Sequence, residues 1–227
     1  YAALKETYCG SVGVEYMYIN SFTERRWVQA RLEPVHARGT YTSAQKLRFL
    51  ERLTAAETLE RYLHTRYVGQ KRFSLEGGES LIVSLDELIR AAGGSGVDDI
   101  VIGMAHRGRL NVLCNIVGKT YEQIFSAFED KSIPDQSYGS GDVKYHQGYS
   151  SQTEALNGRK IYVKLLPNPS HLEAVNPVVE GFCRGKLDIL YNENFDRVLP
   201  ILIHGDAALA GQGIVYEVIQ MMNLQGY

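Results

Sequence analysis

The sequence has 227 residues, of which 44% are hydrophobic and 22% charged, so it can bury a sizeable core and is too apolar for a disordered chain. Its formal net charge of −2 excludes a strong overall attraction to nucleic acids or acidic membranes. The three cysteines, Cys9, Cys114 and Cys183, are odd in number and widely spaced, which predicts free thiols in a reducing compartment.

The first part of the chain is predicted to be mainly helical. Residues 14–19 are short, aromatic and favour β-structure. After them, a Ser or Thr is followed three residues later by Glu or Gln at three places, which predicts helix starts at Ser21, Thr42 and Thr54. No catalytic spacing is recognisable here. We therefore interpret residues 1–70 as a helical scaffold segment.

From residue 71 onward, strands and helices are predicted to alternate. Apolar runs predict strands at residues 99–103, 161–166 and 198–203, the last of them buried on both faces. Apolar residues at helical spacing predict helices near residues 81–94, 110–117 and 214–224, and another that begins at Thr120. A further helical region, broken by Pro177, is predicted to extend to residue 191. A polar loop is predicted over residues 131–151. This alternation predicts an α/β fold, a mostly parallel sheet covered by helices, over residues 71–227.

Polar stretches follow each predicted strand or lie in a loop beside one. In the first, His106, Arg107 and Arg109 come directly after a strand and favour an anion site over an exposed basic turn. The second, 139–148, has glycines on both sides of Lys144 and His146. Such a segment is either a mobile loop that carries polar groups into a site or an ordinary surface loop.

Two more polar stretches directly follow or include the end of a predicted strand. Residues 167–173 contain two prolines and Ser170, a plausible N-cap, and taken alone they predict only a helix start. Residues 201–213 form a strand, a turn with Asp206 and a run of small residues that includes Ala207 and Ala208. A lone carboxylate at this position indicates a hard cation, and small residues allow a ligand to approach the backbone, although a tight structural turn is the alternative.

Other common sites are excluded by their missing motifs. There is no Walker A pattern, no G-x-S-x-G elbow and no His/Cys arrangement spaced for zinc. Gly211-x-Gly213 is followed by Tyr216, so the third small position of a dinucleotide fingerprint is absent. A nicotinamide-dependent dehydrogenase is therefore disfavoured.

Taken in order, these stretches resemble the thiamine-diphosphate-dependent decarboxylating component of the 2-oxoglutarate dehydrogenase complex. The matching segments are KRFSLEGGES (71–80), GMAHRGRLNVL (103–113), GSGDVKYHQG (139–148), NPSHLEAVNPVVEG (168–181) and LPILIHGDAALAGQGIVYE (199–217). The resemblance covers nearly the whole chain. It implies that residues 71–227 are the first, truncated part of the thiamine diphosphate-binding domain.

The resemblance also implies roles for individual residues. Asp206 would be a Mg²⁺ ligand, and His106 and His146 would be catalytic residues that face the substrate. The residues expected to bind thiamine diphosphate are Arg107, Ser170, Leu172, Asp206, Ala207 and Ala208, and those expected to bind substrate are His106, Arg107 and His146. The second Mg²⁺ ligand, an Asn, and the glutamate that activates the cofactor would lie outside these residues.

The activity implied by the resemblance is oxidative decarboxylation of 2-oxoglutarate in the tricarboxylic acid cycle. The succinyl group would pass to the lipoyl group of a dihydrolipoamide succinyltransferase, and the full-length enzyme would be a homodimer without nucleic-acid or membrane partners. A bacterial cytoplasm is favoured over a mitochondrial matrix. Two alternatives stay open. One is a relative that acts on 2-oxoadipate, since one methylene changes discrimination by only ~1–3 kcal/mol. The other is that these residues alone are inactive.

Overall fold

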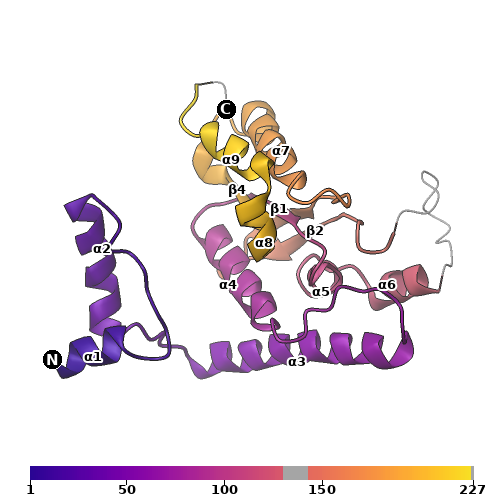
Figure 1. Cartoon of the computed structure of the whole chain (residues 1–227), viewed down its shortest axis with the longest axis horizontal. Helices are drawn as coiled ribbons and strands as arrows, with labels where there is room; N and C mark the ends of the chain where they lie inside the picture. Colours follow the sequence, from indigo (N-terminus) through magenta and orange to yellow (C-terminus); the bar gives the residue numbers. More distant parts are fainter. Residues whose placement is uncertain (130–142, 226–227) are drawn as a thin grey trace. The chain divides into compact units, whose positions relative to one another are not determined.

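A computed structural model of the chain describes residues 1–129 and 143–225. The chain divides into two compact units, Tyr1–Phe49 and Leu50–Tyr227. The elements are α1 (Ala2–Tyr8), α2 (Phe22–Leu32), η1 (Glu33–Val35), α3 (Ser43–Arg66), α4 (Ser80–Gly94), β1 (Asp99–Met104), α5 (Arg109–Asn115), α6 (Tyr121–Phe128), β2 (Tyr149–Glu154), β3 (Lys160–Leu165), α7 (Val175–Leu190), η2 (Phe195–Arg197), β4 (Val198–Ile203), α8 (Asp206–Gly211) and α9 (Gly213–Gln220) (Figure 1).

The second unit is built on a four-stranded sheet in the order β2-β3-β1-β4. β1 pairs in parallel with both β3 and β4, and β2 pairs antiparallel with β3. The predicted mostly parallel sheet with flanking helices is therefore confirmed. Because β1, β3 and β4 run in the same direction, their carboxyl ends meet at one edge of the sheet.

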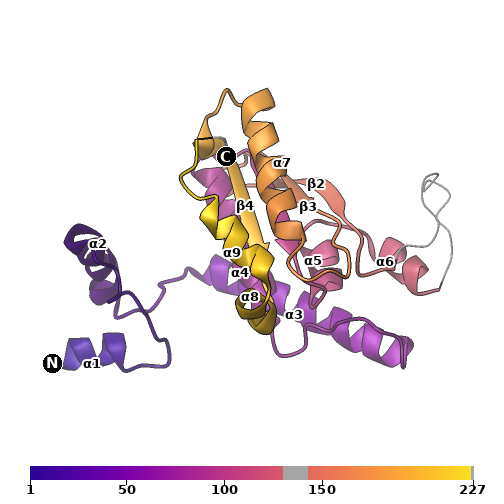
Figure 2. The same ribbon diagram turned by 45° about the horizontal axis from the view of Figure 1, so that its top comes forward.

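Helices cover the sheet on both faces. Alternate residues of β1 belong to different hydrophobic clusters. Ile100 and Ile102 pack with the apolar residues of α3 to α6, whereas Val101 packs with those of α7. In Figure 2, α7 runs beside β4, in agreement with the contacts between them. The close approach of α7 requires a glycine in β1, because a Cβ on Gly103 would lie 2.5 Å from Cγ2 of Val179.

The first unit consists of α1, α2, η1 and the beginning of α3. Its polar centre is Tyr8, whose hydroxyl lies 2.8 Å from that of Tyr16 and donates to Glu33 Oε1 at 3.0 Å. Of the three predicted helix starts, Ser21 is confirmed as the N-cap of α2. The boundary between the compact units does not test where the cofactor-binding domain begins, and the expected boundary after residue 70 stays a prediction.

Several local predictions were wrong. Residues 14–19 form no strand, and α3 continues without interruption through Thr54, which is not a helix start. The strand β2 was missed because its sequence, Tyr-Ser-Ser-Gln-Thr-Glu, is polar and alternates only between half-buried and exposed positions. An edge strand needs no apolar run, since only one of its sides is hydrogen-bonded.

Three further corrections concern the second half of the chain. The N-cap of α7 is Ala174, so Ser170 does not begin that helix. Pro177 does not break α7, because it lies in the first turn, where a missing N–H costs nothing. β4 is buried only at Val198 and half-buried from Leu199 to Ile203. Among the described residues β4 is an edge strand, so its side chains have a neighbouring strand on one side only.

No helix in the described ranges is long and apolar enough to cross a membrane.

Candidate functional site

The C-terminal edge of the sheet, where β1, β3 and β4 end at Met104, Leu165 and Ile203, gathers the three polar stretches that follow these strands, and the described part of the 139–148 stretch lies beside them. Just past the strands, the N–H of Ala105 donates to the carbonyl of Ile203 at 3.2 Å. This bond extends the pairing of β1 with β4 by one residue. Segments that are about a hundred residues apart in sequence are thereby brought to one place.

His106 lies at the end of β1 in a cluster of rings. Its ring centroid is 4.9 Å from that of His146, 5.2 Å from that of Tyr145 and 5.0 Å from that of Phe73. The two histidines that were predicted to face the substrate are therefore neighbours. The remaining part of the second stretch, residues 139–142, lies outside the described residues.

His106 is poised to remain neutral near physiological pH. Burial and then the charge of His146 lower its pKa from the usual 6.5, against the opposing influence of the carbonyls of Pro169 and Asn168. Its Nε2 atom is buried and has no hydrogen-bond partner among the described residues. A buried ring nitrogen without a partner is costly.

Arg109 is buried at this edge and binds the backbone of several of its segments. Its side chain is fully buried and donates to the carbonyls of Met104 at 3.2 Å, Gln147 at 2.9 and 3.1 Å, and Leu166. Burial lowers its pKa to about 10. The expectation that Arg109 serves an anion site was wrong, because its guanidinium holds strand ends and the segment of His146 together. Arg107, in contrast, is exposed and donates from Nη1 to the carbonyl of Ser74 at 2.9 Å.

The segment after β3 lies against the histidines. Nε2 of His146 is 3.0 Å from Oγ of Ser170, and the N–H of Asn168 donates to the carbonyl of His146 at 3.0 Å. Asn168 is 4% exposed, and its Nδ2 donates to the carbonyl of Met104 at 2.8 Å. Its Oδ1 is buried and finds no partner among the described residues. Asn168 thus presents a second unsatisfied polar atom beside His106.

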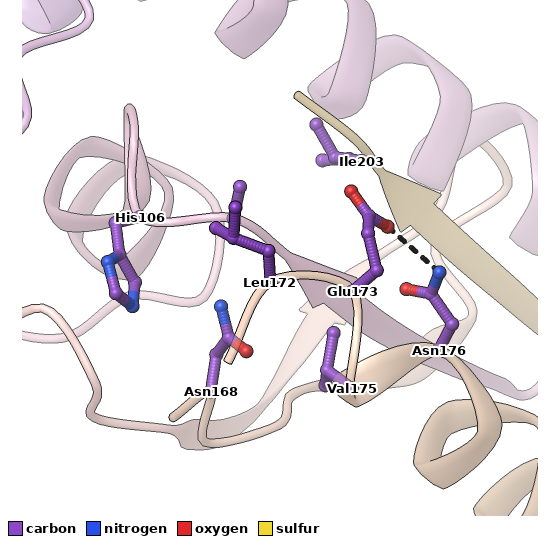
Figure 3. A pocket seen from close by; sticks show the side chains of 8 residues that line it. His106, Asn168, Leu172, Glu173, Val175, Asn176 and Ile203 are labelled. Atoms are coloured by element: carbon purple, nitrogen blue, oxygen red, sulfur yellow. Dashed lines mark hydrogen bonds between the residues drawn. The ribbon is translucent and has the colours of Figure 1, made fainter. Parts of the chain in front are cut away.

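A small pocket opens at this edge and joins the three strand ends. Its lining includes His106, Asn168, Leu172, Glu173 and Ile203. In the view of Figure 3, Leu172 stands between His106 on one side and Glu173 on the other. The pocket is the place where the unsatisfied atoms of His106 and Asn168 meet the end of β4.

Glu173 connects the end of β3 to the end of β4. It is 7% exposed, and its Oε2 accepts hydrogen bonds from Nδ2 of Asn176 at 2.8 Å and Nδ1 of His204 at 2.6 Å. Figure 3 shows the bond to Asn176 as a dashed line. His204 is two residues before Asp206, so this pair lies beside the predicted cation ligand.

Asp206 begins α8 directly after the turn at the end of β4. Asp206 and Ala207 are exposed and Ala208 is half-buried. Within the part of the chain that the structure describes, the Asp206 carboxylate has no hydrogen bond or ion pair, and no group of three or more His, Cys, Asp or Glu could hold a metal. A cation at Asp206 therefore requires further ligands from elsewhere.

The structure thus brings together His106, His146, Ser170 and Leu172, and it places Asp206 to Ala208 at the end of the adjacent strand. Arg107 lies at the same edge but its guanidinium contacts the segment at Ser74 instead of the pocket. The sequence reasoning missed Asn168 and Glu173 as site residues. The signal for Asn168 was its place between two prolines directly after a buried strand, where an amide is poised to bond the neighbouring strand.

The match to known families agrees with this arrangement. The family model described as "Dehydrogenase E1 component" matches residues 51–227. The chain belongs to this family. The matched region includes every strand of the sheet and all four polar stretches.

Similar proteins of the same family cover this chain almost entirely. The chain is 52% identical over 224 residues to the 2-oxoglutarate dehydrogenase E1 component of Cupriavidus necator, an alignment that covers 99% of this chain and 23% of that protein. The proteins of the same name from Azotobacter vinelandii and Brucella ovis are 49% and 46% identical, over 99% of this chain and 24% and 23% of their own lengths. The chain thus spans about a quarter of the length of these relatives.

Proposed function

We propose that the complete protein containing this chain is the decarboxylating component of a 2-oxoglutarate dehydrogenase complex. It would use thiamine diphosphate and Mg²⁺ and pass a succinyl group to the lipoyl group of a dihydrolipoamide succinyltransferase. The observation that carries the proposal is the 52% identity, over 99% of the chain, to a protein named 2-oxoglutarate dehydrogenase E1 component. The proximity of His106, His146 and Ser170 at one sheet edge supports it.

The residues at this edge fit a diphosphate held through a cation. The exposed carboxylate of Asp206 has no partner among the described residues, which suits a hard cation that prefers oxygen ligands. Two or more ligands are needed in addition, and we propose that one is an Asn outside this chain. Ala207 and Ala208, which have small side chains, would leave the backbone accessible to the cofactor. Arg107, Ser170 and Leu172 would complete the cofactor contacts from this chain.

When bound, thiamine diphosphate supplies the electron sink into which a 2-oxo acid loses carbon dioxide. The contribution of this chain is to orient the substrate and to place hydrogen-bond donors. His106 and His146 are suited to this role because their rings are adjacent and both flank the segment of Ser170. A neutral His106, favoured by its lowered pKa, can donate one N–H to a developing negative charge or take up a proton. Arg107 would attract a substrate carboxylate.

We further propose the organisation of the complete enzyme. Residues 1–70 would be a helical scaffold and residues 71–227 the first part of the diphosphate-binding domain. The whole would form a homodimer, without nucleic-acid or membrane partners. The relatives come from bacteria, which favours a bacterial cytoplasm over a mitochondrial matrix.

The test is an assay of the complete protein with thiamine diphosphate and Mg²⁺, with 2-oxoglutarate and 2-oxoadipate compared as substrates. We expect decarboxylation of 2-oxoglutarate that is lost on chelation of Mg²⁺. Turnover of 2-oxoadipate alone would overturn the substrate assignment. The isolated 227 residues serve as a control, and we expect them to bind thiamine diphosphate weakly because the described residues contain no group of three or more metal ligands.

A further inference from the structure

Glu173 links the two segments that carry most of the proposed cofactor residues. Ser170 and Leu172 precede it in the same loop, and its carboxylate reaches His204, two residues before Asp206. No other hydrogen bond between side chains of residues 167–173 and 204–208 is found in the described part of the chain. The Glu173 side chain is therefore the polar connection between them.

The backbone at Glu173 has an unfavourable conformation for a glutamate. Its φ is +66°, a left-handed conformation that residues with a Cβ adopt only at a cost. Gly or Asn would suit such a turn better, so the turn alone does not explain a glutamate. A non-glycine residue in this conformation persists where its surroundings hold it, and such residues concentrate at functional sites.

The contacts of the carboxylate form a rigid chain from a helix to the turn. Asn176, 3% exposed, lies in the first turn of α7 and donates to Glu173 Oε2. The same oxygen accepts from His204 at 2.6 Å. Since α7 packs on the sheet through Val175 and Val179, this chain of bonds ties the turn after β4 to the core.

We propose that Glu173 is a positioning residue, which through His204 holds the turn at residues 204–208 in one conformation before the cation binds at Asp206. The expected effect on cofactor binding rests on the proposed function, because it assumes that Asp206 binds the cation. The inference also predicts a property of the ligand-free protein, namely a rigid turn after β4. The role assigned to Glu173 is to hold other residues, and no contact with the substrate is needed.

The first test is amide hydrogen exchange of the complete, ligand-free protein with Glu173→Gln. The substitution keeps the size of the side chain and removes the charge that holds the His204 N–H. We expect the amides of residues 204–211 to exchange at least about fivefold faster, because local opening of the turn becomes easier. The amides of α7 should be unchanged. Unchanged exchange in residues 204–211 would overturn the proposal.

The second test measures affinity in the same variant. Groups that orient a metal ligand typically contribute about 10–100-fold in metal affinity, so the Kd for Mg²⁺ at saturating thiamine diphosphate should rise at least about tenfold. The KM for 2-oxoglutarate should change less than about twofold, a separation that a general loss of structure would not produce. An equal loss in both quantities would contradict a positioning role.

Matched variants make the two tests specific. Glu173→Gly accepts the positive φ without strain and removes the carboxylate, so it keeps the proposal testable if Glu173→Gln folds poorly. His204→Ala should cause the same change as Glu173→Gln, and the double variant should be no worse than either single one. Glu180→Gln, on the same helix α7, should leave the turn and the Mg²⁺ affinity unchanged.

The outcomes separate this inference from the proposed function. If the wild-type protein binds no thiamine diphosphate with Mg²⁺, the proposed function fails, whereas the exchange experiment still decides whether Glu173 holds the turn. If the wild-type protein binds thiamine diphosphate and Mg²⁺ but the effects of Glu173→Gln and His204→Ala are additive in the double variant, Glu173 does not act through His204. In that case the inference is wrong, whereas the proposed function stands.

Discussion

The aspartates at the two edges of the parallel sheet differ in the pairing of their carboxylates. At the N-terminal edge, where β1, β3 and β4 begin, the carboxylate of Asp98 lies between the guanidinium groups of Arg159 and Arg197. The two arginines directly precede β3 and β4. One carboxylate directly before β1 therefore pairs with the arginines that precede both of its parallel neighbours.

Asp99, the next residue, is paired equally well. Its Oδ1 accepts from Nζ of Lys186 at 2.6 Å and its Oδ2 from the hydroxyl of Tyr191, which ties β1 to the end of α7. Burial, reinforced by the bond to Asp99, raises the pKa of Tyr191 to about 12. At this edge the polar groups stabilise the fold.

The C-terminal edge differs because several of its polar atoms have no partner in the described ranges. Nε2 of His106 and Oδ1 of Asn168 are buried without hydrogen bonds, and the carboxylate of Asp206 is exposed without a hydrogen bond or ion pair. Buried unsatisfied atoms cost free energy. We therefore expect the paired aspartates of the N-terminal edge to contribute to stability, and we regard the C-terminal edge as the candidate ligand site.

The largest expected effect lies at the N-terminal edge. Asp99→Ala should lower the free energy of unfolding by about 3–5 kcal/mol, because it leaves the mostly buried ammonium of Lys186 without a counter-charge. The measurement is amide exchange in β1 and α7 of the complete protein. Asp188→Ala, which removes an exposed carboxylate on α7, is the control and should change stability by less than about 1 kcal/mol. If Asp99→Ala lowers the free energy of unfolding by less than about 1 kcal/mol, the polar groups of the N-terminal edge do not stabilise the fold as expected.

The next effect concerns binding at the C-terminal edge. Asp206→Ala should weaken Mg²⁺-dependent binding of thiamine diphosphate to the complete protein by about 100-fold, or about 2.7 kcal/mol, because the cation loses a carboxylate ligand. Its melting temperature should be unaffected, since the carboxylate is exposed and bonds no described residue. Titration calorimetry measures the first quantity and calorimetric unfolding the second. Asp196→Ala, an exposed carboxylate before β4, should change neither. Unchanged affinity in Asp206→Ala would refute the assigned ligand.

The smallest effect is a dependence of stability on pH. Because the pKa of His106 is lowered in the fold, the unfolded chain binds that proton more tightly. The stability contributed by neutral His106 is therefore complete above about pH 6.5 and is lost as the pH falls through 6.5 toward the folded-state pKa. Unfolding of the wild type and of His106→Gln at several pH values measures this loss, which should be absent in the variant. His146→Gln should reduce it by removing the neighbouring charge. Parallel pH profiles for the wild type and His106→Gln would contradict the prediction.

Much of the fold followed from local patterns. The apolar runs of β1 and β3 and the helix expected from Thr120 onward are predictions that the structure confirms. Local patterns failed where tertiary context decides. β2 is polar because it forms an edge, and Pro177 is harmless because α7 begins only two residues earlier.

For the candidate site, the sequence by itself determined that polar stretches follow the strands, and parallel pairing then places those stretches at one edge. It did not distinguish Arg109 from Arg107, although only the former is fully buried. Only the three-dimensional structure shows that Glu173 meets His204 and that Nε2 of His106 has no hydrogen-bond partner within residues 1–129 and 143–225. The physical reason is that such contacts join residues far apart in the chain, so they depend on strand register and helix packing, which local sequence does not encode.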